Sequence, residues 1–402
     1  MSQHGTLVVG QSGGATAVIN ATLAGVIDGG VASGAFDRVV GLRFGIEGLL
    51  NDELIDLTAQ SPETLAGLRA TPSAALGTTR KKMTEADLET IVAKLKAINA
   101  RGLVYIGGND SADTSHRIHQ AAVEAGYEIA VVAAPKTIDN DLPLTDHCPG
   151  YPSLGKFLAN AVRDATYDSL ATPRLHPVKF IEVMGRDAGW VAASTALAFG
   201  ENERDLQPLI FFPETPPAST EDALAEIQAR VDERGWAVVV IPETLRDASG
   251  RHFGGVEPDF VDPHGHAYFP SPAAALTRLV ASQLGLRARY ERPGTAARMS
   301  ISLASPVDLE EAYNLGWSAS ARAATGKSDI MVTLDRVSDQ PYQCAIGTAP
   351  LDQIANHVRT FPDGFLAAGG RAISDSFRAY ALPLLGTDPF PPYVRLDSSL
   401  TI

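Results

Sequence analysis

Cysteines are scarce in this sequence, and long apolar runs and a basic excess are absent. It contains two cysteines, Cys148 and Cys344, which excludes a disulfide-rich scaffold and favours a reduced, cytoplasmic protein. No apolar run approaches the ~20 residues of a membrane-spanning helix. No basic segment opens the chain, so no signal peptide is expected. The formal net charge of −14 argues against nucleic acid as a partner but leaves room for a local phosphate site.

Short apolar runs alternate with amphipathic helical segments over most of the 402 residues. We expect buried strands at residues 6–9, 103–106, 129–134, 179–183, 208–212 and 237–241. Several of these runs are apolar throughout, which is typical of central parallel strands covered on both faces. The alternation predicts an α/β fold with two Rossmann-like lobes and mostly parallel sheets.

The length indicates more than one lobe, because a single hydrophobic core rarely serves so long a chain. We expect an N-terminal α/β lobe at 1–145, a second α/β lobe at 146–340, and a C-terminal extension at 341–402 that returns to pack on the body. Ligands in such folds bind beyond the carboxyl ends of the strands. The residues that follow each strand are therefore the candidate site.

Gly13 and Gly14 follow the first strand and precede a helix. Paired glycines let backbone N–H groups approach an anion, and a helix N-terminus favours negative charge. The segment lacks both the Lys-Ser/Thr of a Walker A loop and the G-x-G-x-x-G of a dinucleotide-binding turn. A phosphate site and a tight turn without a ligand both stay open here.

Two later turns combine glycine with charge. Residues 76–82 place Arg80 and two lysines beside small residues, which suits a polyanion clamp or a solvated basic turn equally well. Residues 107–111 repeat the strand–Gly-Gly–helix arrangement and carry Asp110 and Ser111. A carboxylate there tolerates a phosphate only with Mg²⁺ or a lysine between them, and helix capping is the alternative.

The densest group of charges follows the strand at 129–134, where Lys136 precedes Asp139 and Asp141. Phosphoryl transfer needs a base for the attacking hydroxyl, a cation for the transferring group and often an acid that holds Mg²⁺. This segment supplies all three, and a turn rich in Asp and Asn is the weaker alternative.

Charged residues also follow the strands of the second lobe. Arg186 comes directly after Met184 and Gly185, and Glu243 follows the run at 237–241. Residues 287–298 then contain four arginines, a density that favours a phosphate-binding loop over a solvated face.

In chain order, these segments resemble the signature segments of the 6-phosphofructokinase family over nearly the whole chain. They are Gly13-Gly14, Gly77-Thr-Thr-Arg80, Gly107-Gly108-x-Asp110-Ser111, Thr137-Ile-Asp139-Asn-Asp141, Met184-Gly-Arg186, Glu243 and Gly294-x-x-x-Arg298. Each is weak alone, whereas all of them in order are specific. The resemblance implies the phosphofructokinase fold, with the donor bound by the first lobe and the sugar phosphate by the second.

The resemblance also implies residue roles. Asp139 is the expected general base for the 1-hydroxyl of fructose 6-phosphate, Asp141 supports the base and the metal, and Arg80 and Arg186 steady the transferring phosphoryl group. The remaining expected contacts are Gly13, Gly14, Asp110 and Ser111 with the donor, Thr137, Met184, Gly185 and Glu243 with the sugar, and Arg298 with its 6-phosphate. Arg289 resembles the arginine that a neighbouring subunit donates, which implies a homodimer or homotetramer.

Two positions resemble the pyrophosphate-dependent branch of the family. ATP-using members commonly have glycine at the places of Asp110 and Lys136. The Asp110 carboxylate would obstruct and repel the α-phosphate of ATP, and Lys136 would bind pyrophosphate. We therefore expect reversible transfer from pyrophosphate to fructose 6-phosphate, giving fructose 1,6-bisphosphate and phosphate, with an ATP-dependent 6-phosphofructokinase as the alternative.

The metal site departs from the family pattern, because Asn109 stands where a Mg²⁺-binding acid is usual. A neutral carbonyl oxygen is a poorer ligand. Mg²⁺ is still the expected cofactor, with Asn109 and Asp110 as candidate ligands, supported by water, pyrophosphate oxygens and Asp141.

Two other classes explain less of the sequence. A non-catalytic subunit that keeps the fold is disfavoured by the intact Asp139 and Asp141. A nicotinamide-dependent dehydrogenase is suggested only by the opening strand–glycine–helix unit, which lacks the dinucleotide pattern. His264 and His266 have no third ligand nearby in sequence, so we expect no metal site there.

Overall fold

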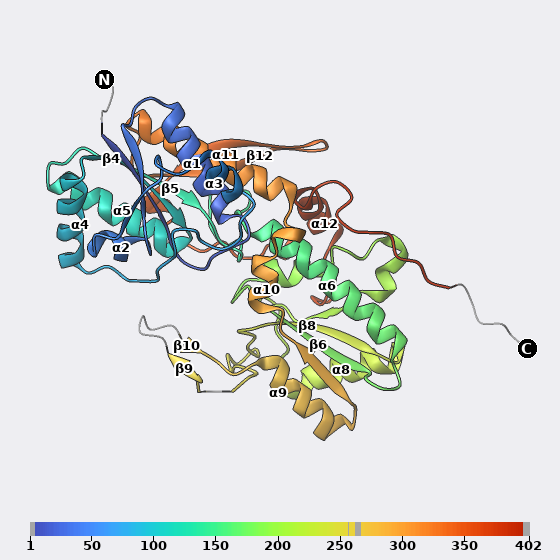
Figure 1. Cartoon of the computed structure of the whole chain (residues 1–402). Helices are drawn as coiled ribbons and strands as arrows, with labels where there is room; N and C mark the ends of the chain where they lie inside the picture. The colour runs from blue at the N-terminus through green and yellow to red at the C-terminus, as the bar shows by residue number, and fades with distance from the viewer. Residues whose placement is uncertain (1–4, 256, 262–266, 397–402) are drawn as a thin grey trace, which may run out of the picture.

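The chain folds into two α/β lobes, each built around its own sheet (Figure 1). The computed structural model describes residues 5–255, 257–261 and 267–396, so His264 and His266 lie outside the described residues. None of the described helices has the length and apolar character needed to span a bilayer. The predicted α/β class with mostly parallel sheets is confirmed.

The larger sheet has seven strands. In order across the sheet they are β13 (Tyr342–Pro350), β12 (Ile330–Asp339), β5 (Ala130–Pro135), β4 (Ala100–Gly107), β1 (Thr6–Gln11), β2 (Arg38–Leu42) and β3 (Leu54–Asp56). The strands from β12 to β2 run parallel, and β13 and β3 pair antiparallel at the two edges. Every residue of β1 and β5 is buried, which explains their continuous apolar sequences.

Helices cover both faces of this sheet. One face packs against α1 (Ile19–Ala32) and α11 (Pro306–Ala324), and the other against α4 (Glu85–Ala97) and α5 (Asn109–Glu124). The short helices α2 (Ile46–Leu50) and α3 (Pro62–Leu68) lie in the connections. Helix α4 begins at a complete capping box formed by Thr84 and Asp87.

Helix α11 follows the second lobe in sequence but packs on α1 of the first lobe (Figure 1). The two helices cross closely, since a Cβ on Gly316 would lie 2.0 Å from the carbonyl oxygen of Thr22. Strands β12 and β13 then extend the first sheet. The two sheets therefore do not follow the linear division at residues 146 and 340 that the sequence suggested, because α11 and β12 cross back to the first lobe.

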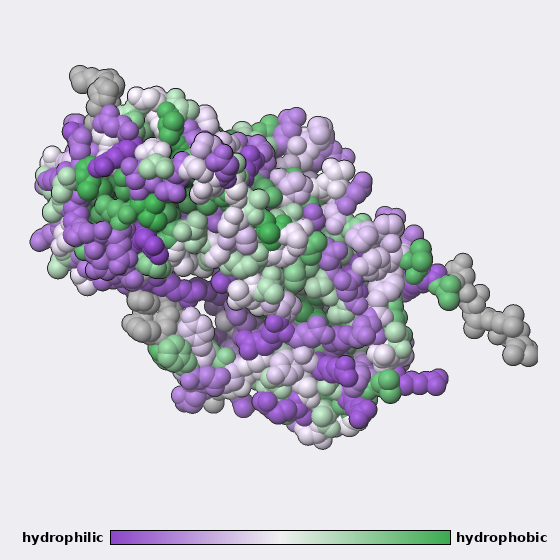
Figure 2. Space-filling model, in the orientation of Figure 1, coloured by the Kyte–Doolittle hydropathy of each residue, from purple (hydrophilic) through white to green (hydrophobic). Residues whose placement is uncertain are grey.

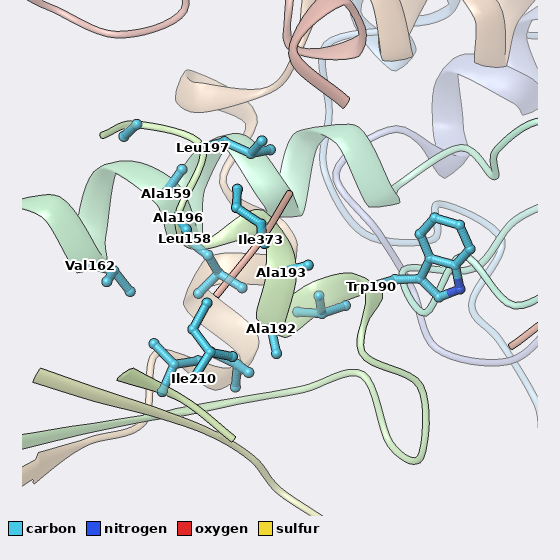
Figure 3. Close-up of a cluster of buried hydrophobic side chains, with 14 of the residues drawn as sticks. Leu158, Ala159, Val162, Trp190, Ala192, Ala193, Ala196, Leu197, Ile210 and Ile373 are labelled. Carbon is cyan, nitrogen blue, oxygen red and sulfur yellow. The ribbon is translucent and has the colours of Figure 1, made fainter. Parts of the chain in front are cut away.

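The smaller sheet has four parallel strands. Its order is β11 (Ala288–Glu291), β6 (Val178–Val183), β8 (Ala237–Pro242) and β7 (Leu209–Ile210). One face packs on α6 (Tyr151–Ala171) and α7 (Trp190–Ser194), the other on α8 (Thr220–Arg234) and α9 (Pro272–Leu279). The C-terminal segment, residues 351–396, follows β13. Figure 3 shows Leu158 of α6, Ile210 of β7 and Ile373 of the C-terminal segment in one apolar cluster.

Shorter elements complete the second lobe and the C-terminal segment. They are the 3₁₀ turn η1 (Glu201–Leu206), the strand pair β9 (Phe260–Val261) and β10 (Ala267–Tyr268), the π-helical turn η2 (Val280–Leu284), α10 (Gly294–Met299), and the 3₁₀ turns η3 (Ile301–Leu303), η4 (Leu351–Gln353), η5 (Asp363–Phe365) and η6 (Leu382–Leu385) with α12 (Asp375–Ala381). Phe361, Phe377 and Leu384 of the C-terminal segment belong to the same buried cluster as α6.

Candidate active site

Loops from the carboxyl ends of strands in both sheets meet around one cavity of about 480 Å³. Nine residues predicted from the sequence line it: Gly14, Arg80, Lys136, Thr137, Asp139, Met184, Arg186, Glu243 and Arg298. Figure 2 shows mainly hydrophilic residues around the hollow between the two lobes. Another hollow, of about 500 Å³ beside α11 and β13, contains none of the predicted residues.

Lys136 supplies a buried cation directly after β5. Its backbone N–H donates to the carbonyl oxygen of Gly107 at the end of β4, 2.9 Å away, and the residue is only 3% exposed. Gly13 has a φ of +76°, which disfavours any side chain, and a Cβ there would lie 3.1 Å from Nζ of Lys136 and crowd the ammonium group. Burial lowers the pKa of Lys136 to about 8, while Asp139 opposes this shift.

Asp139 lies on the same loop, with its side chain 17% exposed. Burial raises the pKa of Asp139 to about 7; Asp141 adds to this shift, whereas Arg186 opposes it. Nε of Arg186 lies 3.9 Å from Oδ2 of Asp139. A carboxyl group that titrates near neutral pH is well suited to accept a proton from a substrate hydroxyl.

Arginines from both lobes give the cavity its positive charge. Nε of Arg298 is buried and has no hydrogen-bond partner among the described residues, and a Cβ on Gly14 would lie 3.0 Å from its Nη1. Arg80 of the first lobe donates through Nη1 to Oη of Tyr268 in the second, at 3.2 Å. Two arginines beside a glycine turn, one with an Nε that is unpaired within the described part of the chain, suit a ligand that carries phosphate at more than one point.

Glu243 provides an acceptor on the second lobe, directly after β8. Its backbone N–H donates to the carbonyl oxygen of Val183, 2.9 Å away, at the end of β6. Burial raises the pKa of Glu243, and the neighbouring Glu182 adds to this effect. Glu182 in turn lies 2.7 Å from Nε of Arg292. The second lobe therefore combines carboxylate acceptors with arginines, a combination that suits a phosphorylated polyol.

The sequence profile described as PFK, Phosphofructokinase, matches residues 6–321. The chain belongs to the phosphofructokinase family. It is 39% identical to pyrophosphate–fructose 6-phosphate 1-phosphotransferase of Xanthomonas campestris pv. campestris, covering 98% of this chain and 97% of that one. The identity is 36% to the protein of the same name from Methylococcus capsulatus, over 95% of this chain and 92% of the other.

A solved structure agrees with the phosphofructokinase assignment. The crystal structure of pyrophosphate-dependent phosphofructokinase from Nitrosospira multiformis superposes with a TM-score of 0.86 at 34% identity, covering 98% of each chain. The corresponding structure from Marinobacter aquaeolei gives 0.85 at 34% identity, covering 97% of this chain and 94% of that one. Both cover the C-terminal segment as well as the two lobes, so the likeness is not confined to one sheet.

Several phosphofructokinase signature residues shape the site without lining the cavity. Gly185 has a φ of +121°, and a Cβ there would lie 2.8 Å from Cβ of Val191. Ser111 is buried, and its Oγ would lie only 2.0 Å from a Cβ on Gly107. Asp110 is exposed in the first turn of α5. Asp141 acts on the site through its charge, which raises the pKa of Asp139.

The structure argues against Asn109 as a metal ligand. Its Oδ1 accepts a hydrogen bond of 2.7 Å from the backbone N–H of Asn356, and its Nδ2 donates to the carbonyl oxygens of Ile354 (3.2 Å) and His357. The amide is therefore used to attach α5 to the C-terminal segment. The local sequence gives no sign of this contact, because the partners of Asn109 come from more than 200 residues further along the chain.

Arg289 does not line the cavity of its own chain. It lies exposed on the edge strand β11, opposite Lys179 near the start of β6. The cavity is lined by residues that follow the other end of β6. A role at the site of a neighbouring subunit remains a prediction.

Seven cavity residues were missing from the sequence-based set, among them Ile138, which stands between the predicted Thr137 and Asp139. Asp187, Thr244 and Arg292 stand next to predicted residues or within the arginine-rich segment, so their neighbours provided a signal. Arg246, Tyr268 and Phe269 come from a segment that reads as an ordinary long loop. Nothing local indicates that this loop reaches Arg80 in the other lobe.

Proposed function

We propose that this chain transfers a phosphoryl group reversibly between pyrophosphate and the 1-hydroxyl of fructose 6-phosphate, forming fructose 1,6-bisphosphate and phosphate. The observation that carries this proposal is the buried ammonium of Lys136 against the Gly13 turn, at the donor side of the cavity. A compact diphosphate needs concentrated positive charge close to the backbone, and it needs no space for a nucleoside. The full-length relatives that bear this activity in their names support the same reaction.

Asp139 acts as the general base in this proposal. Its carboxylate takes the proton of the 1-hydroxyl, and the oxygen attacks the terminal phosphorus of pyrophosphate. A bond forms between that oxygen and phosphorus while the bond to the bridging oxygen breaks, and inorganic phosphate leaves. Arg186, 3.9 Å from Asp139, offsets the negative charge that gathers around the transferring group. In the reverse direction, protonated Asp139 returns the proton.

The donor is held by the first lobe, and the acceptor mainly by the second. Lys136, the Gly13-Gly14 turn and Arg80 bind pyrophosphate on the first lobe. Arg298, whose Nε lacks a partner among the described residues, binds the 6-phosphate on the second. Glu243, Thr137 and Met184 contact the sugar. This proposal keeps the donor lobe and the sugar lobe expected from the sequence and adds α11, β12 and β13 to the first.

Mg²⁺ is the proposed cofactor. Protein sites for this ion commonly use one or two carboxylates together with substrate phosphates, and Asp110 and Asp141 are the carboxylates that would hold it. Among the described residues no group of three or more His, Cys, Asp or Glu side chains forms a cage for a metal. That fits an ion carried largely by pyrophosphate, whose charge it partly neutralises when bound.

We further propose that the enzyme is a cytoplasmic homodimer or homotetramer in which Arg289 serves the neighbouring subunit. Light scattering of the purified protein gives the number of subunits. Mixing Arg289→Ala with Asp139→Asn subunits tests the sharing, because a hybrid contains one site with both native residues. Recovery of activity on mixing supports the shared site, and its absence in hybrids of confirmed composition contradicts it.

The donor assay separates this proposal from an ATP-dependent 6-phosphofructokinase. Purified protein with fructose 6-phosphate and Mg²⁺ receives either pyrophosphate or ATP, and faster turnover with ATP overturns the proposal. The double variant Asp110→Gly with Lys136→Gly adds a structural test. It is expected to lose the use of pyrophosphate, because the buried ammonium is gone. It is also expected to accept ATP, because space for a nucleotide opens.

A further inference from the structure

The loop that carries Asp139 and Asp141 wraps around the guanidinium group of Arg359, which comes from the C-terminal segment. Nε and Nη2 of Arg359 donate to the carbonyl oxygen of Asn140 at 3.2 and 2.8 Å. Nη1 donates to the carbonyl oxygens of Thr145 (2.8 Å) and Asp146 (2.6 Å). The backbone N–H of Arg359 donates to the carbonyl oxygen of Asp141 at 2.7 Å. Both ends of the loop are thus fixed to one residue.

The residue between the two aspartates has a left-handed backbone conformation that hydrogen bonds hold in place. Asn140 has a φ of 55°, in a region that asparagine adopts more readily than other residues with a side chain. Its side chain accepts from the backbone N–H of Cys148 at 2.9 Å and donates to Oη of Tyr380 at 3.3 Å. Tyr380 in turn donates to the carbonyl oxygen of Asp146 at 2.8 Å. The C-terminal segment therefore contacts this turn through two side chains, those of Arg359 and Tyr380.

Arg359 is itself held in place. Its guanidinium lies over the ring of Trp190, 4.5 Å from the centroid, and Phe361, two residues on, is buried in the core of the second lobe. The family profile ends at residue 321, so this support comes from outside the matched region. An arginine suits the position because its planar fork donates on two sides, whereas a lysine donates from a single nitrogen.

We propose that Arg359 is a positioning residue that holds the Asp139–Asp141 loop in the geometry of phosphoryl transfer. This inference rests on the proposed function. Arg359 is absent from the lining of the cavity, so it acts through the loop and not on the substrates. Displacing a catalytic group by about 1 Å lowers the rate by about 100-fold. Loss of the guanidinium should therefore reduce kcat and leave the substrate-binding arginines in place.

The kinetic test compares Arg359→Met and Arg359→Lys with the wild-type enzyme. We expect kcat to fall by about 100-fold in Arg359→Met and by about 10-fold in Arg359→Lys, with both KM values changed by less than about twofold. Tyr380→Phe removes one hydroxyl from the same turn and serves if Arg359→Met does not fold. Arg378→Met is the matched control, because Arg378 is a half-buried arginine of the same segment that donates to the carbonyl oxygens of Phe199 and Ala196.

Hydrogen–deuterium exchange gives a readout that does not depend on activity. The backbone amides of Asp139, Asp146 and Cys148 are hydrogen-bonded in the structure, and we expect peptides covering 137–148 to exchange faster in Arg359→Met but not in Arg378→Met. Unchanged kcat and exchange in Arg359→Met, or equal losses in Arg378→Met, overturn the inference. If the wild-type enzyme transfers phosphate from neither donor, the proposed function fails, while the exchange data still report whether Arg359 holds the loop.

Discussion

Replacing Lys136 by methionine removes the ammonium group beside Gly13 and keeps a side chain of similar length in the same buried place. A charge-assisted hydrogen bond contributes about 1.5–3 kcal/mol. Because each 1.4 kcal/mol is a factor of about ten, kcat/KM for pyrophosphate should fall by about 10- to 150-fold near pH 7. The value for fructose 6-phosphate at saturating pyrophosphate should change much less, since Arg298 and Glu243 remain.

The pH dependence of kcat/KM for pyrophosphate is a second, independent test of the role of Lys136. Burial lowers the pKa of Lys136 to about 8, so the charged form predominates below that pH and is lost as the pH rises through it. Burial raises the pKa of Asp139 to about 7, and a general base must be deprotonated, so activity is lost as the pH falls through that value. The profile of kcat/KM for pyrophosphate should therefore be bell-shaped, with limbs near pH 7 and 8.

The assay follows fructose 1,6-bisphosphate through a coupled aldolase reaction across this pH range. In Lys136→Met the basic limb should disappear while the acidic limb stays, and Lys136→Arg should move the basic limb upward because a guanidinium keeps its charge. Lys96→Met is the control, since Lys96 is exposed on α4 and donates to the carbonyl oxygen of Ala125. A basic limb that persists in Lys136→Met refutes the assignment of Lys136 as the donor-binding cation.

Three further changes test other parts of the molecule. Asp139→Asn should lower kcat by about 100- to 10,000-fold with fructose 6-phosphate binding retained in calorimetry; a nearly unchanged kcat means that another group is the base. Arg298→Met should raise KM for fructose 6-phosphate by about tenfold or more and spare KM for pyrophosphate; equal effects on both would contradict the separate subsites. Burial opposes the charged form of His147, but its hydrogen bonds with Asp146 and Glu311 raise its pKa to about 9. Because the folded pKa lies above the unfolded value of 6.5, this stabilisation is complete below about pH 6.5 and disappears as the pH rises through about 9. The free energy of unfolding should therefore fall by up to about 3 kcal/mol across that window in the wild type and by less in His147→Gln, measured by urea denaturation at several pH values. Parallel curves for the two proteins would show that His147 is not responsible.

The sequence was sufficient to predict the six strands β1, β4, β5, β6, β7 and β8 and the residues that follow them, but not β2, β3, β11, β12 or β13. Strands such as β4, β5 and β8 are buried on both faces, and that environment produces continuous apolar runs. Parallel strands place their carboxyl ends at one edge, so residues following different strands were expected to meet. Lys136 and Asp139 were found in this way, because they stand on one short loop directly after β5.

Contacts between distant parts of the chain could not be predicted in this way. Strand β12 (Ile330–Asp339) was not among the predicted strands, and nothing in its own sequence shows that it joins the first sheet. The Asn109 amide is used by residues 354–357, and Arg359 reaches the catalytic loop. Neither contact leaves a local pattern, because the partner groups are mostly backbone carbonyls that every residue has.

The two central ionisable groups of the site are tuned by one physical cause. Burial disfavours charge on both, so it raises the pKa of Asp139 and lowers that of Lys136. The two pKa values therefore approach each other from opposite sides. A neighbouring group of opposite charge counteracts the shift of each. Arg186 opposes the shift of Asp139, and Asp139 opposes the shift of Lys136. A change that admits water to the loop would favour both charged forms and widen the active pH range. It would also weaken Asp139 as a base, so the enzyme cannot broaden its pH range by this route without losing turnover.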